Sequence, residues 1–172
     1  MQVARLRLQV AGLNPQVLSS GTGVICDIVS ATSADGDATA SVPTIALRAD
    51  LDALAMDDES TTPYRSTVPG VAHACGHDAH TTIVLGAGLA LAARGLRSGR
   101  GGVRLLFEPA EEAVPGGAVD LIEQGALDNI GAVFGFHCDP KIDVGRVGLR
   151  VGALTAATDA VTIHLRGPGG HT

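Results

Sequence analysis

Residues 43–49 read PTIALRA, a short apolar run that leads into the acid Asp50, and the predicted fold is built outward from this run. An apolar run of this length between proline and polar residues is typical of a buried β-strand. Two more runs have the same character, at residues 103–107 and 132–136, and residues 78–96 have the length and apolar side chains of a helix. Short strands that alternate with helices predict an α/β sandwich around a mostly parallel sheet.

The composition indicates one aliphatic core. The 172 residues are 45% hydrophobic, which argues against disorder, and only one tyrosine and three phenylalanines supply aromatic rings. Few aromatic side chains and a formal charge of −6 both disfavour nucleic acid as a partner, because its binding requires stacking platforms and cations. No apolar run reaches membrane-spanning length, and the N-terminus has no signal-peptide pattern. We therefore expect a cytoplasmic protein that binds neither nucleic acid nor a membrane.

Cys75 and His77 stand one residue apart just before the predicted helix. In an extended segment this spacing puts both side chains on one side, and a thiolate and an imidazole are good zinc ligands. An isolated pair of this kind can equally be a polar loop. Here, however, further metal-competent residues follow the other predicted strands, and open α/β sheets bind ligands at the carboxyl ends of their strands. The sequence therefore predicts a metal site.

Glu111 and Glu112 are adjacent carboxylates that follow the strand at residues 103–107. Neighbouring side chains diverge, so one can bind a metal ion while the other faces the water that the metal activates. A Lewis acid together with a free carboxylate is a useful pair for hydrolysis. Two adjacent glutamates on their own are more often a solvated acidic turn. The catalytic interpretation is supported only by the other candidate ligands in the sequence.

Two further histidines are candidates. His137 directly follows the strand at residues 132–136, where a histidine on its own is more often a satisfied core residue. His171 follows Gly169 and Gly170, which permit close backbone approach.

These segments together resemble the aminoacylase/carboxypeptidase metallopeptidase family. The resemblance is closest to its branch of hippurate hydrolases, N-acyl-L-amino-acid amidohydrolases and indoleacetyl-amino-acid hydrolases. Its most specific pieces are Cys-Gly-His-Asp at residues 75–78 and Pro-Ala-Glu-Glu at residues 109–112, in this order. The other matching pieces are residues 46–54, 63–64, 69–70, 73–81, 134–137 and 169–171.

The resemblance implies an aminopeptidase-like catalytic domain with two divalent metal ions. Zinc is the first choice, and manganese, cobalt or nickel are alternatives. The implied reaction is hydrolysis of the amide bond of an N-acyl amino acid, or of a peptide-like amide, through a metal-activated water. The implied metal ligands are Cys75, His77, Glu112 and His137, and the implied catalytic residues are Glu111 as general base, Asp50 (with Asp52 as the alternative) as supporting acid, and His171 as a contact for the substrate or its oxyanion.

Members of this family are longer than 172 residues. We therefore expect residues 1–152 to be a partial catalytic domain and residues 153–172 to be the beginning of a smaller α+β dimerisation domain. The full-length form is expected to be a homodimer, and the family supplies one more histidine ligand from beyond this segment. Ala55 and Glu108 depart from the Pro and Gln that the family usually has.

Two alternatives remain open from the sequence. The chain can be a catalytically inactive, truncated remnant that at most binds metal. It can also be a cysteine hydrolase that uses Cys75 with His77 or His137.

Overall fold

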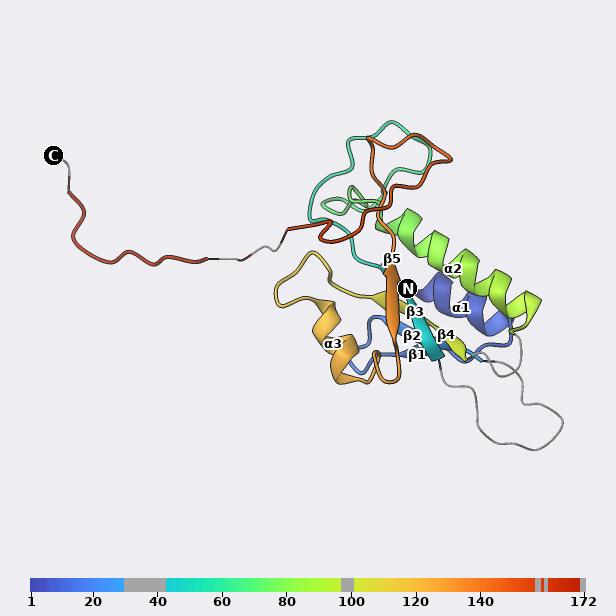
Figure 1. The fold of residues 1–172 in the computed structure, drawn as a ribbon. Coiled ribbons are helices and arrows are strands. Elements are labelled where there is room, and N and C mark those ends of the chain that lie inside the picture. The colour runs from blue at the N-terminus through green and yellow to red at the C-terminus, as the bar shows by residue number, and fades with distance from the viewer. Residues whose placement is uncertain (30–42, 97–100, 157–158, 160, 171–172) are drawn as a thin grey trace. The chain divides into compact units, whose positions relative to one another are not determined.

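The computed structural model describes residues 1–29, 43–96, 101–156, 159 and 161–170. The chain divides into two units, Met1–Cys138 and Asp139–Thr172, which are described separately. All helices and strands of the described residues belong to the first unit (Figure 1). In chain order they are α1 (Gln2–Val10), β1 (Gln16–Val17), β2 (Val24–Ile28), β3 (Pro43–Asp50), α2 (His77–Arg94), β4 (Gly102–Glu108), α3 (Gly117–Glu123) and β5 (Ala132–Gly135).

The five strands form one sheet in the order β1-β2-β4-β3-β5. β3 lies at the centre of the parallel part and pairs with β4 on one side and with β5 on the other. β2 pairs antiparallel with both β1 and β4. Among the described strands, β2 alone therefore runs against the others, and the predicted mostly parallel sheet is confirmed with this one reversal.

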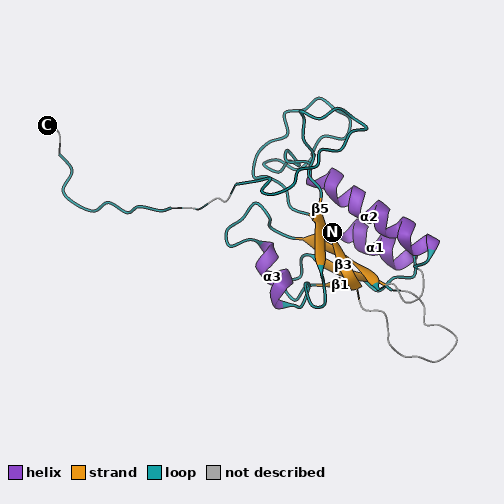
Figure 2. Ribbon diagram, viewed as in Figure 1, coloured by secondary structure: helices purple, strands orange, loops and turns teal. Residues whose placement is uncertain are grey.

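Helices cover both faces of the sheet (Figure 2). Successive side chains of a strand point to opposite faces, so β4 supplies both layers. Leu105 and Phe107 join the core beneath α1 and α2, together with buried residues of both helices such as Leu8. Leu106 points the other way and packs against Leu121 of α3. The predicted α/β sandwich is thus confirmed.

α2 brings the site residues to the edge of the sheet. It begins at His77, directly after Gly76, whose φ of 86° is a left-handed conformation that favours glycine. Asp78 lies in its first turn, where a negative charge interacts favourably with the helix dipole. Among the described residues, no helix is both long enough and apolar enough to cross a membrane.

In the second unit, an alternating apolar pattern in the sequence has no matching strand among the described residues. Val147, Leu149, Val151, Val161, Ile163 and Leu165 alternate in the sequence and predict strands within residues 144–165, yet the described residues of this range contain no strand. All six side chains are exposed. Alternation marks a face that a sheet can bury, but a strand forms only where a partner supplies backbone hydrogen bonds. The expected boundary between residues 152 and 153 concerns the domains of a longer protein and stays a prediction.

Candidate metal centre

The candidate residues gather at one edge of the sheet. Asp50 ends β3 and Glu108 ends β4. β5 ends two residues before His137. α2 begins at the same place with His77. The carboxyl ends of β3, β4 and β5 therefore deliver polar side chains together, as the sequence predicted for a parallel sheet.

His77 is almost fully buried, with 1% of its surface exposed. Its Nδ1 atom lies 3.0 Å from the backbone carbonyl oxygen of Asp52 and 3.1 Å from the carboxylate oxygen Oδ1 of the same residue. Both oxygens accept hydrogen bonds, so Nδ1 carries the proton and donates. The Nε2 atom of the neutral ring then keeps its lone pair, and it is a buried nitrogen without a hydrogen-bond partner among the described residues.

Three carboxylates surround this Nε2 atom. It lies 3.7 Å from Oδ2 of Asp50, 3.7 Å from Oε1 of Glu112 and 3.9 Å from Oε2 of Glu111. These separations exceed hydrogen-bond length. Nitrogen and oxygen ligands that stand 2.0–2.2 Å from a tetrahedral zinc ion are about 3.4 Å from each other, so the observed spacing suits ligands that share a cation. The orphaned lone pair and its acidic surroundings fit a divalent metal ion.

Cys75 and His137 extend this cluster. The Sγ atom of Cys75 lies 3.5 Å from Nε2 of His137. Nδ1 of His137 donates to the backbone carbonyl oxygen of Cys138 at 2.7 Å, so the lone pair on Nε2 faces the thiol. One ligand atom each of Cys75, His77 and Glu112 lie within 4.8 Å of one another. The structure thus brings together all four residues that were predicted as metal ligands.

The surroundings of Cys75 disfavour its thiolate form. Desolvation, followed by the hydrogen bond and charge of Glu112 and the charges of Glu111 and Asp50, raises the pKa of Cys75 above its usual value. Reactive cysteines require the opposite environment, which is electropositive and stabilises a thiolate. This geometry therefore disfavours the cysteine-hydrolase alternative.

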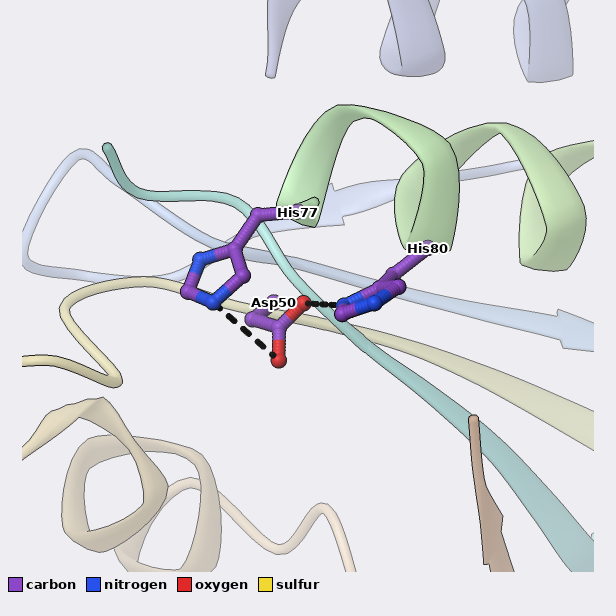
Figure 3. Close-up of side chains that lie close together, drawn as sticks. All are labelled: Asp50, His77 and His80. Atoms are coloured by element: carbon purple, nitrogen blue, oxygen red, sulfur yellow. Dashed lines mark hydrogen bonds and ion pairs between the residues drawn. The ribbon is translucent and has the colours of Figure 1, made fainter. Parts of the chain in front are cut away.

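Asp50 and Asp52 hold different positions. Asp50 is 1% exposed and receives a hydrogen bond from Nδ1 of His80 at 2.7 Å (Figure 3). It receives another from Arg48 at 2.8 Å. Burial by itself raises the pKa of Asp50, but the hydrogen bond of His80 and then the charge of Arg48 act against it, and the pKa lies below its usual value. Asp52 contacts His77 directly and also accepts the backbone N–H of Glu112 at 3.0 Å. Both acids thus touch the cluster, and Asp52 orients His77.

Arg48, His80 and Glu108 are buried or half-buried residues of this site that the sequence analysis did not select. Arg48 stands two residues before Asp50 on the same face of β3 and pairs with Glu108, the register neighbour of Asp50. His80 lies three residues after His77, on the same side of α2. The spacing of two residues on the strand and of three on the helix could have identified Arg48 and His80 from the sequence.

The remaining predicted residues are Glu111 and His171. The side chain of Glu111 is 39% exposed, so its carboxylate borders both the cluster and the solvent from which a substrate arrives. His171 lies outside the described residues.

The fold and this cluster define the class as an α/β protein with a candidate metal site at the carboxyl edge of its sheet. The chain belongs to peptidase family M20/M25/M40, whose model matches residues 46–170. The family resemblance expected from the motifs is therefore confirmed.

Three relatives and one solved structure illustrate this membership. The chain is 44% identical over 164 residues to N-acetyl-L-cysteine deacetylase of Bacillus subtilis, which covers 95% of this chain and 37% of the relative. It is 41% identical over 128 residues to N-acyl-L-amino acid amidohydrolase of Geobacillus stearothermophilus, and the aligned residues are 74% of this chain and 34% of that relative. A Rhodococcus jostii protein that carries the name glutamate–cysteine ligase 2-3 is 46% identical over 170 residues, which are 99% of this chain and 20% of that protein. The crystal structure of the Bacillus subtilis YXEP protein, a dinuclear metal-binding peptidase of family M20, superposes with a TM-score of 0.71 at 35% identity and covers 84% of this chain and 38% of that one.

The chain therefore spans less than two fifths of the length of these relatives.

Proposed function

We propose that the full-length protein is a metal-dependent amidohydrolase that cleaves the amide bond between an acyl group and an amino acid. One observation carries this proposal: the buried Nε2 atom of His77 has no hydrogen-bond partner among the described residues and lies among three carboxylates. Membership of the peptidase family supports it. So do the names of two relatives, which describe a deacetylase and an amidohydrolase of N-acyl amino acids.

Each residue then has a chemical role. Cys75, His77, Glu112 and His137 hold two divalent ions, with zinc as the first choice and manganese, cobalt or nickel as alternatives. When bound, such ions polarise the amide carbonyl and lower the pKa of water. Glu111 accepts a proton from the attacking water and passes it to the leaving amine nitrogen, as a half-exposed carboxylate beside the cluster is able to do.

The proposal also covers the remaining site residues, the assembly and the domains. Asp52 and Asp50 support the cluster, and His171 contacts the substrate or its oxyanion. The full-length protein acts as a cytoplasmic homodimer on a small-molecule substrate. Residues 1–152 belong to its catalytic domain, and residues 153–172 begin a dimerisation domain.

The test combines metal analysis with an activity assay on the full-length protein. We expect two metal ions per chain and hydrolysis of at least one compound in a panel of N-acetyl, N-benzoyl and indoleacetyl amino acids. Removal of the ions by a chelator abolishes turnover, and their return restores it. Glu111→Gln keeps the metal and loses activity by about 10²–10⁴-fold, because the proton acceptor is gone.

The matched control is Glu123→Gln, which removes an exposed carboxylate at the end of α3 and leaves both metal content and turnover unchanged. Turnover that survives both Glu111→Gln and metal removal contradicts the proposal. Bound metal without hydrolysis of any compound in the panel contradicts the proposed amidohydrolase activity.

A further inference from the structure

His80 is a fully buried histidine whose two ring nitrogens are both hydrogen-bonded. It lies in the first turns of α2 and has 0% of its surface exposed. Its Nδ1 atom lies 2.7 Å from Oδ1 of Asp50, and its Nε2 atom lies 2.8 Å from the backbone nitrogen of Cys138. His80 thereby connects the carboxyl end of β3 to the segment that follows β5.

These two contacts fix where the proton of the ring lies. The backbone N–H of Cys138 can only donate, so Nε2 of His80 accepts and carries no proton. The proton of the neutral ring is then on Nδ1, which donates to the carboxylate of Asp50. A second proton on Nε2 would point directly at the N–H hydrogen of Cys138, and the two hydrogens would repel each other. His80 is therefore held as the neutral Nδ1–H tautomer.

This assignment separates His80 from the ligands. Asp50, His77 and His80 lie close enough to hold a metal ion as a group of three. However, both nitrogens of His80 are engaged, and Oδ2 of Asp50 is bound to Arg48 at 2.8 Å. Of the two histidines in this group, only His77 retains a free nitrogen lone pair.

We propose that His80 is a positioning residue of the metal centre: it holds the segment that carries His137 against Asp50 and does not itself bind metal. This inference rests on the proposed function. The ring of His80 also packs against that of His137, with centroids 4.7 Å apart. A Cβ atom at Gly76 would lie only 3.3 Å from Cβ of Cys138 and 3.5 Å from Nε2 of His80, so the start of α2 and this segment approach each other closely.

The first test reads the tautomer directly. The protein is labelled with ¹⁵N-histidine, and two-bond ¹H–¹⁵N correlations are recorded before and after addition of Zn²⁺. We expect the Nδ1–H pattern for His80 in both spectra, with the signal assigned by its loss in His80→Phe. His77 shows the same pattern before addition, but its Nε2 resonance shifts when zinc binds. A zinc-dependent shift of Nε2 of His80 overturns the proposal, because it identifies a ligand.

The second test measures zinc affinity by competition with a chromophoric chelator. His80→Phe keeps the ring volume without either hydrogen bond, and we expect zinc affinity to fall by about 10–100-fold, as is typical when a group that orients a ligand is lost. His80→Gln carries an amide near the Nε2 position and can still accept from Cys138, whereas His80→Asn can only reach Asp50. The glutamine variant is therefore expected to bind zinc more tightly than the asparagine variant.

His73→Gln is the matched control, because His73 is an exposed histidine of the preceding loop, and it leaves zinc affinity unchanged. Circular dichroism establishes that each compared variant is folded. If the unaltered protein binds zinc and folded His80→Phe binds it equally well, this inference fails and the proposed function stands. If the unaltered protein binds no divalent metal, both fail.

Discussion

Nδ1 of His77 lies 3.1 Å from the carboxylate of Asp52, and this contact decides what the rest of the imidazole can do. Because the Nδ1–H group donates to Asp52, the Nε2 atom of the neutral ring keeps a lone pair. That atom is buried and lies 3.7 Å from Glu112. A carboxylate that holds the far nitrogen of a ligating histidine fixes both its tautomer and its orientation.

Asp52→Ala is therefore expected to weaken zinc binding by about 10–100-fold, because His77 loses its orienting partner. Asp52→Asn loses less, since its amide oxygen and the backbone carbonyl still accept the Nδ1 proton. Competition with a chromophoric chelator measures both changes. Asp143→Ala removes an exposed acid of the second unit and serves as the control. Equal zinc affinities for Asp52→Ala and the unaltered protein would contradict the role given to Asp52.

Zinc is expected to protect one particular thiol from alkylation. Cys26 is 1% exposed and stays unreactive in the folded protein, whereas Cys138 is exposed and reacts with iodoacetamide. Cys75 is half-buried, and its raised pKa makes its reaction slow at neutral pH and faster under alkaline conditions. Mass spectrometry of peptides locates the label. Addition of zinc should abolish labelling of Cys75 and spare that of Cys138, and equal labelling of Cys75 with and without zinc would remove it from the ligand set.

We expect the buried thiol of Cys26 to make the folded protein less stable at alkaline pH. Burial, and secondly the charge of Asp27, raises the pKa of this thiol from 9.0 to about 11. Between these values the unfolded state has released a proton that the folded state retains, so the free energy of unfolding falls as pH rises, by on the order of 2 kcal/mol. Below pH 9 both states are protonated, and the thiol contributes no pH dependence.

Urea denaturation at several pH values from 7 to 10.5 measures this slope. Cys26→Ala is less stable at every pH because it leaves a cavity, but it lacks this component of the alkaline decline. Cys138→Ala is the control, since it removes an exposed thiol and retains the slope of the unaltered protein. Identical alkaline slopes for Cys26→Ala and the unaltered protein would refute the prediction.

Two glycines of α2 offer opposite outcomes for the same substitution. A Cβ atom at Gly88 would collide with the side chain of Leu105 in β4, whereas a Cβ atom at Gly86 would meet nothing within 4 Å. Gly86→Ala is expected to stabilise the protein by about 0.5–1 kcal/mol through helix propensity. Gly88→Ala receives the same gain but overpacks the core, which costs about 1–3 kcal/mol, so it is expected to be destabilising overall. Denaturation midpoints compare the two, and equal effects would show that α2 does not pack this closely on the sheet.

Local sequence patterns were sufficient for the elements that build the site. The apolar runs at residues 43–49, 103–107 and 132–136 correspond to β3, β4 and β5, and the predicted helix at 78–96 corresponds to α2. These elements were predictable because the periodicity and length of an apolar run reflect which faces of it are buried. The same logic failed for residues 144–165, where alternation is present and a partner strand is not found among the described residues.

By itself, the sequence determined the family and the residue types available as ligands, because Cys-Gly-His-Asp and Pro-Ala-Glu-Glu are local motifs. Only the tertiary structure decided which acid holds His77 and which histidine has a free lone pair. Asp52 is 25 residues from His77, and Cys138 is 58 residues from His80. In such contacts, an accepting partner requires a proton on the ring nitrogen, and a donating partner requires a lone pair there. Which partner is present depends on how the strands and α2 pack together. A hydrogen-bond pattern across these separations follows from the fold and cannot be read from the spacing of residues along the chain.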